Sequence, residues 1–338
     1  MNQITTIGLD LAKHVFQVHA ADAGGAVVLR RSLRRGQVEA FFRALPPCLV
    51  GMEACGTAHH WARVLAELGH AVRLIPPAYV KAYVRRNKTD AADAEAICAA
   101  LSRPGLRFVP VRTPEEQAAA SQHRVRELLV RQRTMLINAL RAHLAEFGLV
   151  AAKGPANLPG LMAAVEDPAD GRLPALLREA LVVTARALKA IEAELEALDA
   201  QVLAFHKASD TSRRLATIPG FGPIVASAVA ARVKNPERFA SGRDFAAYLG
   251  LTPKQHSSGG KVRLGGISKR GDAYLRRLLV NGAMAVLTGR RAKHDPWLAR
   301  LMATKPRMVV AVALANKMAR IAFAVMVRGT EFRAATAA

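Results

Sequence analysis

Cysteine is scarce in this sequence, and the few cysteines are not arranged in pairs. The chain of 338 residues has three, Cys48, Cys55 and Cys98, and they form no CxxC motif. An odd number of scattered cysteines argues against a disulfide framework and fits a reducing compartment. Residues 1–10 have no basic segment before an apolar stretch, so we expect no secretory signal and a cytoplasmic protein.

Long uninterrupted apolar runs are missing as well. The most apolar stretch, residues 308–327, is interrupted by Lys317 and Arg320. Charged side chains are costly inside a bilayer, so we expect a buried or amphipathic helix here and not a membrane span. The sequence therefore predicts no membrane partner.

Acidic residues are few compared with basic ones. Asp and Glu number 26 against 49 Lys and Arg, which gives a formal net charge of +23 and a pI of about 11. Such an excess favours a polyanionic partner, above all nucleic acid, over a generic basic protein bound to ribosomes or membrane surfaces. Aromatic residues make up only 5 % of the chain and hydrophobic residues 51 %, which indicates a helix-rich globular protein.

Four of the scarce acidic residues stand where a metal-dependent phosphoryl-transfer enzyme carries its ligands. Asp10 and Glu53 each end an apolar run that predicts a buried strand. Asp90 and Asp93 are three residues apart, so on a helix they share one face. Carboxylates that gather repel one another unless a cation lies between them, and Mg²⁺ prefers oxygen ligands. Taken singly, Asp10 is an ordinary strand-end residue and Asp90 an ordinary helix N-cap.

Residues 1–110 are predicted to form an α/β domain with an RNase H-like (RuvC-like) sheet. Apolar runs predict strands over 4–9, 14–20, 26–32, 48–52 and 71–75, and helical patterns predict helices over 37–44, 58–68 and 90–101. Three early strands followed by strands that alternate with helices is the order of an RNase H-like fold. In that fold the first strand, the fourth strand and a late helix carry the carboxylates.

Residues 111–207 are predicted to be a helical segment with a coiled-coil seam. A helix is expected over 115–147, and 148–174, which has several Gly and Pro residues, is expected to be the loop of a helical hairpin. The following helix has apolar residues at alternating three- and four-residue steps. These seam residues are Leu177, Leu181, Leu188, Ile191, Leu195, Leu198, Val202 and Phe205, with Thr184 in the polar slot. The seam predicts dimerisation, with a hairpin inside one chain as the alternative.

Residues 208–338 are predicted to be a mainly α domain that contacts nucleic acid. The turn with Gly220 and Gly222, which enters an alanine-rich helix, resembles a helix-hairpin-helix motif. In that motif the glycines permit the protein backbone to approach the nucleic acid closely, and free amides at the helix N-terminus bind a phosphate oxygen. A turn between two ordinary packed helices has the same pattern.

The segment 251–272 is too rich in Gly, Ser, Lys and Arg to be buried, and such loops often carry function. Ser258 precedes two glycines that would let a DNA backbone approach its hydroxyl. A serine is a weak nucleophile and needs a neighbouring base such as His256, or cations near the reacting phosphorus. The candidate phosphate-binding cations are Lys261, Arg263, Lys269, Arg276 and Arg277. A flexible basic loop without a catalytic role is the alternative.

Motifs along nearly the whole chain resemble the DEDD-type transposases of insertion sequences, which join a RuvC-like domain to a serine-bearing transposase domain and include RNA-guided recombinases. The motifs keep that family's order and approximate spacing. They are Gly8-Leu9-Asp10, Met52-Glu53-Ala54, Asn87-Lys88-Thr89-Asp90-Ala91-Ala92-Asp93-Ala94, Ile218-Pro219-Gly220, Leu249-Gly250-Leu251-Thr252-Pro253, Ser258-Gly259, Ile267-Ser268-Lys269-Arg270-Gly271 and Leu275-Arg276-Arg277-Leu278-Leu279.

The resemblance implies roles for individual residues. The four carboxylates named above would bind Mg²⁺, for which Mn²⁺ could substitute, in a site that typically holds two ions. Ser258 would attack DNA and form a covalent phosphoserine link, with the adjacent Ser257 as the alternative nucleophile. Lys88, beside the aspartate motif, is a further candidate for nucleic-acid contact.

The resemblance also implies partners. Members of the family assemble as oligomers in which the serine of one subunit meets the carboxylates of another, and a structured non-coding RNA guides them. We therefore expect a site-specific recombinase that acts on element and target DNA, as a dimer or tetramer, in the bacterial cytosol or nucleoid. Two other hypotheses are a RuvC-like Holliday-junction resolvase or nuclease that uses metal-activated water, and a non-catalytic nucleic-acid-binding protein.

Overall fold

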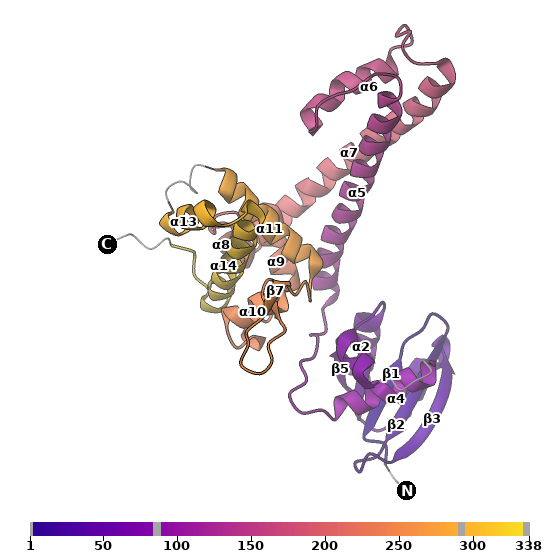
Figure 1. The fold of residues 1–338 in the computed structure, drawn as a ribbon. Coiled ribbons are helices and arrows are strands. Elements are labelled where there is room, and N and C mark those ends of the chain that lie inside the picture. The colour runs from indigo at the N-terminus through magenta and orange to yellow at the C-terminus, as the bar shows by residue number, and fades with distance from the viewer. Residues whose placement is uncertain (1–2, 84–88, 290–294, 334–338) are drawn as a thin grey trace. The chain divides into compact units, whose positions relative to one another are not determined.

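The computed structural model describes residues 3–83, 89–289 and 295–333 (Figure 1). The chain forms two compact units, Met1–Gln117 and Ala118–Ala338, and each is described by itself. Lys88 lies outside the described residues. The predicted division into three domains, with boundaries near 110 and 207, stays a prediction.

The first unit is built on a five-stranded sheet. Its strands are β1 (Thr6–Asp10), β2 (Val15–Ala21), β3 (Val27–Arg34), β4 (Leu49–Glu53) and β5 (Ala71–Ile75), in the spatial order β3-β2-β1-β4-β5. The strands β1, β2 and β3 form an antiparallel meander, and β4 and β5 run parallel to β1. The predicted mixed α/β region is confirmed. The first and last residues of each predicted strand lie within two residues of those of the observed strand.

Helices cover both faces of this sheet (Figure 1). They are α1 (Val38–Arg43), α2 (Ala58–Glu67), α3 (Pro77–Val80) and α4 (Asp90–Leu101), with 3-10 turns η1 (Arg35–Gln37) and η2 (Lys81–Tyr83). On one face, Phe42 of α1 and Trp61 of α2 pack with the strand residues Leu9 and Met52 in a buried apolar cluster. Helix α4 packs on the other face, mainly against β1 and β2.

Glycines let α4 lie directly on the sheet. A Cβ atom at Gly8 in β1 would come within 2.1 Å of the Ala94 carbonyl oxygen and 2.5 Å of the Cys98 backbone nitrogen. A Cβ atom at Gly51 in β4 would come within 2.6 Å of the Leu101 side chain. All three distances are far below van der Waals contact, so only glycine at these two positions permits this approach. The close packing brings the N-terminus of α4 to the ends of the central strands.

The described residues of the second unit form helices and one β-hairpin. Its elements, the first of which starts in the preceding unit, are α5 (Pro114–Ala145), η3 (Pro155–Asn157), α6 (Leu158–Glu166), α7 (Ala175–Ala208), α8 (Asp210–Ala216), α9 (Pro223–Arg232), η4 (Pro236–Arg238), α10 (Gly242–Tyr248), β6 (Pro253–Gln255), β7 (Leu264–Ile267), α11 (Ala273–Thr288), α13 (Pro296–Thr304) and α14 (Arg307–Arg328).

The long helices α5 and α7 form an antiparallel hairpin within one chain. Leu140 of α5 packs in the same buried cluster as Leu188 of α7, and Arg126 of α5 pairs with Asp199 of α7. Four seam residues of α7 are buried, namely Leu181, Leu188, Leu195 and Val202, whereas the alternate positions Leu177, Thr184, Ile191, Leu198 and Phe205 are half-buried. The hairpin thus buries part of the seam within one chain, and dimerisation through the half-buried seam residues stays a prediction.

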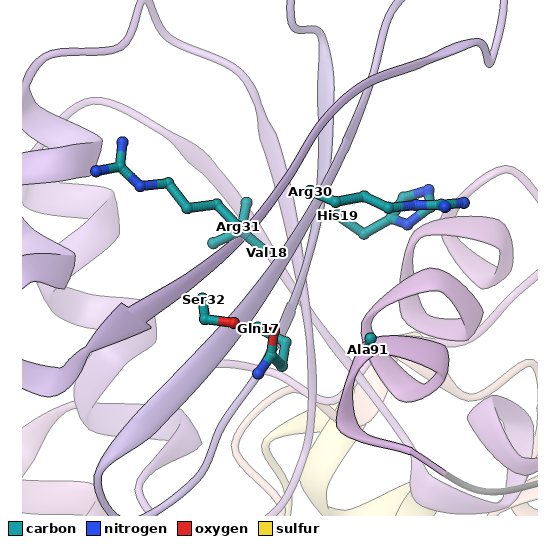
Figure 2. Close-up of a pocket in the computed structure, with 7 residues that line it drawn as sticks. All are labelled: Gln17, Val18, His19, Arg30, Arg31, Ser32 and Ala91. Carbon is teal, nitrogen blue, oxygen red and sulfur yellow. Dashed lines mark hydrogen bonds between the residues drawn. The ribbon is translucent and has the colours of Figure 1, made fainter.

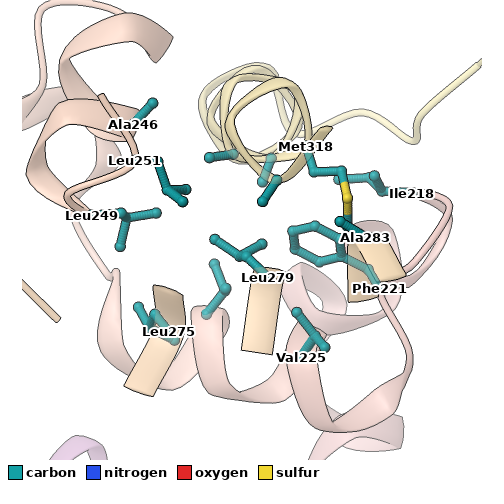
Figure 3. Close-up of a cluster of buried hydrophobic side chains, with 14 of the residues drawn as sticks. Ile218, Phe221, Val225, Ala246, Leu249, Leu251, Leu275, Leu279, Ala283 and Met318 are labelled. Atoms are coloured by element: carbon teal, nitrogen blue, oxygen red, sulfur yellow. The ribbon is translucent and has the colours of Figure 1, made fainter. Parts of the chain in front are cut away.

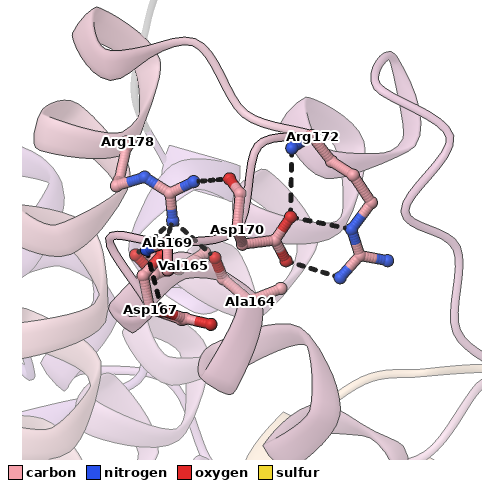
Figure 4. Close-up of polar contacts among 7 residues, drawn as sticks. All are labelled: Ala164, Val165, Asp167, Ala169, Asp170, Arg172 and Arg178. Atoms are coloured by element: carbon pink, nitrogen blue, oxygen red, sulfur yellow. Dashed lines mark hydrogen bonds and ion pairs between the residues drawn. The ribbon is translucent and has the colours of Figure 1, made fainter.

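The far end of this hairpin contains a helix that was not expected from the sequence. The prediction of a loop over 148–174 is wrong in part, because α6 lies inside it, with a proline in the first turn, where that residue is tolerated. Figure 4 shows how Arg178 of α7 closes this end. Its guanidinium donates to the carbonyl oxygens of Ala164, at 2.8 Å, and of Asp167 and Asp170. These contacts satisfy carbonyl groups at and just beyond the end of α6, which lack intrahelical partners.

The remaining helices pack around one apolar core, in which Phe221, Leu279 and Met318 meet (Figure 3). Gly220, with a φ of 85°, lies directly against α11, because a Cβ atom at Gly220 would come within 2.7 Å of the Gly282 carbonyl oxygen. Packing therefore accounts for Gly220. Gly222 is the exposed N-cap of α9, and phosphate binding at this turn stays a prediction.

Among the described residues, only α14 is long and apolar enough to cross a membrane. Ala311, Leu314, Ala315 and Met318 of this helix are buried in the core of the second unit. Lys317 interrupts its apolar sequence and places its ammonium group 4.4 Å from the centroid of the Trp297 ring. These contacts fit the predicted buried helix.

His123 of α5 is a buried histidine in the second unit. It is 1 % exposed, and its Nδ1 lies 3.1 Å from the Tyr274 hydroxyl of α11. Burial, together with the nearby cations Arg232 and Arg126, lowers the pKa of His123 from 6.5 to about 4. The neutral form is therefore the one compatible with this packing.

We expect the second unit to lose stability between pH 6.5 and pH 4 because of His123. Below pH 6.5 the unfolded chain binds a proton there, whereas the folded chain does not until about pH 4, which costs about 2 kcal/mol at pH 5. Hydrogen exchange of the α5 and α11 amides at pH 7 and pH 5 would measure this loss. His123→Gln should remove most of the pH dependence, while replacement of the exposed His143 on the same helix should not. Equal pH dependence in all three proteins would contradict the assignment.

Candidate metal and nucleic-acid site

The four predicted carboxylates come from three elements on one face of the first sheet. Asp10 is the last residue of β1 and Glu53 the last residue of the parallel neighbour β4. Asp90 is the first residue of α4, and Asp93 follows one turn later. Thr89, not Asp90, is the N-cap, since its hydroxyl accepts a hydrogen bond from the Ala92 amide at 3.2 Å. Asp90 is therefore free of the capping role that its sequence position suggested.

Three of these carboxylates lie close together. Oxygen atoms of Asp10, Asp90 and Asp93 are all within 4.8 Å of one another. Oxygen ligands around one divalent ion stand at comparable separations, given metal–oxygen distances of about 2.0 to 2.6 Å. Glu53 lies outside this trio, although its charge is near enough to affect Asp10. The donor set consists of oxygen atoms alone and fits a hard cation such as Mg²⁺.

The electrostatics of Asp10 also fit a cation site. Burial, together with the nearby charges of Asp93, Asp90 and Glu53, raises the pKa of Asp10 from 3.8 to about 6, although a hydrogen bond from the Leu11 amide acts in the opposite direction. An ionised carboxylate in this position lowers the stability of the fold when no cation is bound next to it. A divalent cation between the carboxylates would remove that cost.

The predicted serine loop is a β-hairpin in the second unit. Strands β6 and β7 pair from Gln255↔Leu264, and the pairing continues to a bridge between Ser258 and Lys261. Gly259 and Gly260 form the two-residue turn, with φ values of 54° and 77°, and the Lys261 amide donates to the Ser258 carbonyl oxygen at 3.0 Å. Two positive φ angles are what a type I′ hairpin turn requires. The glycines are therefore explained by the turn itself.

The two serines of this hairpin face opposite ways. Directly paired residues share a face, so His256, Ser258, Lys261 and Arg263 lie on one side. Ser257 lies on the other side, where its hydroxyl accepts hydrogen bonds from the Arg263 amide at 3.1 Å and from Gln255 Nε2 at 3.2 Å. No described residue hydrogen-bonds the Ser258 hydroxyl. The structure thus groups an exposed serine with a histidine and two cations.

The base of the hairpin is held firmly. A Cβ atom at Gly271, which has a φ of 72°, would come within 1.8 Å of the Tyr248 carbonyl oxygen, and one at Gly250 within 2.3 Å of the Arg270 carbonyl oxygen. The Arg276 guanidinium donates to the carbonyl oxygens of Leu249 and Arg270, at 3.0 and 2.8 Å. An exposed tip on a rigid base is a typical arrangement for a functional loop.

Two of the predicted phosphate-binding cations already interact with other groups of the protein. Arg276 is engaged at the hairpin base, and Arg277 pairs with Glu127 at 2.6 Å. Lys261 and Arg263 are exposed on the hairpin, and Lys269 is an exposed residue at a positive φ of 55°. Nucleic-acid contact by any of these residues stays a prediction, and geometry favours the two on the hairpin.

Gly8→Ala tests how the carboxylates are brought together. We expect a loss of about 3 kcal/mol in stability, because the new methyl group would push α4 from the sheet, and a roughly tenfold or greater loss in Mn²⁺ affinity as Asp90 and Asp93 move. Thermal melting and calorimetric titration would measure both. Gly36→Ala, where a Cβ atom meets nothing within 4 Å, is the matched control. A variant with unchanged metal affinity would show that α4 does not position the site.

A mixed five-stranded sheet with carboxylates at two adjacent strand ends and on a following helix is typical of enzymes that act on phosphodiester bonds with divalent metals. Residues 7–148 match a DEDD transposase family, described as "Transposase", and residues 212–298 match "Transposase IS116/IS110/IS902 family". The chain belongs to the IS110/IS116 family of transposases, which are enzymes that act on DNA.

Similar proteins extend over the full chain. A protein named probable family 20 transposase from Pseudomonas aeruginosa is 52 % identical over 98 % of this chain and 99 % of its own length. The transposase for insertion sequence element IS1328 from Yersinia enterocolitica is 42 % identical over 98 % of this chain and 99 % of its own length. The transposase for insertion sequence element IS1111A from Coxiella burnetii is 38 % identical over 98 % and 92 %, respectively.

Proposed function

We propose that this transposase cuts and rejoins DNA through a covalent link between Ser258 and a DNA phosphate, with Mg²⁺ held by its carboxylates. The observation that carries the metal part is the gathering of the Asp10, Asp90 and Asp93 oxygens within 4.8 Å in a protein of net charge +23. A basic protein attracts DNA, and the acidic cluster gives a cation a defined place beside it.

Asp10, Glu53, Asp90 and Asp93 would hold the metal, with one or two ions. When bound, Mg²⁺ polarises the scissile phosphate and stabilises the leaving oxygen. The protein residues supply the rest. Lys261 and Arg263 bind phosphate oxygens beside the reacting centre, where a positive charge is most effective as negative charge develops.

The Ser258 hydroxyl attacks the phosphorus in line and forms an O–P bond as the bond to the 3′ oxygen breaks. The serine proton passes to a base, for which His256 on the same hairpin face is the candidate, and the leaving 3′ oxygen takes up a proton to become a free hydroxyl. The phosphodiester energy is conserved in the seryl phosphate. Attack by the 3′ hydroxyl of an exchanged strand then restores the serine and joins element to target.

Guidance by a structured non-coding RNA, assembly as a dimer or tetramer and a cytosolic or nucleoid location complete the proposal. The RNA rests on the family resemblance. Support for an oligomer comes from the half-buried seam residues of α7, such as Ile191 and Leu198, which a second copy would cover. The carboxylates and Ser258 lie in different units of the chain, which is compatible with a site completed by two copies.

A label-transfer assay tests the proposal. The wild-type protein is incubated with labelled DNA from the element's ends, RNA transcribed from the element's non-coding end and Mg²⁺, and label at protein mass is sought on a denaturing gel. We expect an adduct that releases phosphoserine on acid hydrolysis and that disappears with EDTA or without the RNA. Cleaved DNA without an adduct would support a metal-dependent nuclease that uses water. No Mg²⁺ dependence would remove the metal role.

A further inference from the structure

A row of polar side chains extends from the metal site across the sheet. In the antiparallel ladder Asp10 of β1 pairs with Gln17 of β2, and Gln17 pairs with Ser32 of β3. Directly paired residues lie on the same face, and Gly8, two residues before Asp10, fixes this face as the one that α4 covers. The row therefore runs from the carboxylates to the open edge of the sheet.

Gln17 and Ser32 line a small cavity beside α4. Ala91, next to the metal-site residue Asp90, closes it on the helix side, and its volume is about 160 Å³. This is roughly ten times the space that one water needs. Figure 2 shows His19 and Arg30 on the side of Ala91, whereas Arg31 points to the opposite side of the strand.

Gln17 is held in one orientation in this cavity. The Ser32 hydroxyl donates to Gln17 Oε1 at 2.8 Å, which satisfies the carbonyl end of the amide. No described residue accepts a hydrogen bond from Gln17 Nε2. Gln17 is only half-buried, so its two N–H donors are available to a ligand in the cavity.

The charges around the cavity favour a neutral donor at this position. Arg30 of β3, two residues before Ser32, lies 3.6 Å from Glu95 of α4, so its positive charge is already paired with an acidic residue. A cation next to Asp10 would pair with the carboxylates and compete with the metal. A neutral amide can donate a hydrogen bond to a phosphate oxygen without forming an ion pair with the carboxylates. A hydrogen bond from the Ser32 hydroxyl, and not an ion pair, holds this amide in place.

We propose that Gln17, oriented by Ser32, binds a backbone phosphate of the DNA strand next to the phosphate being cut. This inference rests on the proposed function, since it places the scissile phosphate at the carboxylates. Gln17 is a positioning residue: it fixes the register of the strand over the metal site. Phosphate contacts of this kind set position without adding sequence preference.

Methylphosphonate substitution tests the contact. A methyl group in place of one non-bridging oxygen removes the charge and the acceptor at a single phosphate, and single-turnover cleavage is measured for each position flanking the cut. In the wild-type protein we expect one flanking position to lose about tenfold in rate, as is typical for a hydrogen bond to a charged group. Gln17→Met should lose about as much on unmodified DNA and nothing further at that position.

Matched variants separate the possible outcomes. Arg31→Ala, on the same edge strand but on the opposite face, should keep the full methylphosphonate penalty, and Ser32→Ala should reduce it while retaining the fold, because Ser32 is exposed. An unchanged penalty in both Gln17→Met and Ser32→Ala overturns the inference. If Gln17→Met does not fold, the methylphosphonate penalty in Ser32→Ala alone tests the inference, and an unchanged penalty there overturns it. Absence of any cleavage by the wild-type protein in Mg²⁺, with the RNA transcribed from the element's non-coding end present, would instead contradict the proposed function.

Discussion

Asp10→Asn is expected to abolish strand cleavage, by at least about a thousandfold, because losing a charged metal ligand removes several kcal/mol of transition-state stabilisation. The same change is expected to stabilise the protein when no divalent metal is present. Burial and the charges of Asp93, Asp90 and Glu53 together raise the pKa of Asp10 to about 6. Asparagine keeps the shape of the side chain and removes the repulsion.

The sign of this stability effect follows from the pKa of Asp10. Between pH 4 and pH 6 the folded protein binds a proton at Asp10 that the unfolded chain, with a pKa near 3.8, does not, so stability falls as pH rises through this window. The rise in pKa corresponds to roughly 3 kcal/mol, and solvent screening at this partly exposed side chain reduces it to about 1 to 2 kcal/mol. In EDTA, this contribution should make the first unit of the wild-type protein more stable at pH 5 than at pH 7, and Asp10→Asn should lack it.

Thermal melting in EDTA and in Mg²⁺ would check both effects. Mg²⁺ should raise the melting temperature of the wild-type protein and have little effect on Asp10→Asn, because a ligand stabilises only the folded state that binds it. Glu67→Gln, a change at an exposed acid of the same unit, is the control and should alter neither cleavage nor the response to Mg²⁺. A cleavage-competent Asp10→Asn protein would leave the acidic cluster with a structural role.

The sheet and the clustering of three of the four predicted carboxylates follow from local sequence features. Apolar runs mark β1 and β4, and each ends in an acid, so parallel pairing alone brings Asp10 and Glu53 to one edge. The helical spacing of Asp90 and Asp93 predicts their shared face. Glu53 is expected with the others on this basis, yet it lies outside the closest trio of carboxylates among the described residues.

Other features depend on cross-strand register and tertiary packing. The alignment of Gln17 with Asp10 comes from the β1–β2 register, which a one-residue slip would destroy, and nothing local in the segment around Gln17 marks it. Similarly, the engagement of Arg276 and Arg277 by groups far away in the sequence is invisible in a basic run. The Gly-Gly pair is typical of a type I′ turn, but the polar residues on either side of it do not indicate strands, so the hairpin was not predicted.

Ser258→Ala is expected to eliminate the covalent adduct and to lower strand exchange by at least about a thousandfold, because no other group on its hairpin face can form the phosphoester. DNA binding should persist, since Lys261 and Arg263 remain exposed on the same face. Ser257→Ala removes a hydroxyl that faces the other way and accepts hydrogen bonds within the hairpin. It should keep the adduct and lose about tenfold or less in rate, through loosening of the tip.

Label transfer and filter binding, carried out on both variants, distinguish the possible nucleophiles. An adduct that survives in Ser258→Ala and disappears in Ser257→Ala would assign the chemistry to Ser257 and require the hairpin to twist, because the Ser257 hydroxyl is occupied by the Arg263 amide. Cleavage without an adduct in both variants and in the wild type would leave water as the nucleophile. Where filter binding shows that DNA binding is retained, loss of the adduct in Ser258→Ala alone reports on chemistry and not on DNA affinity.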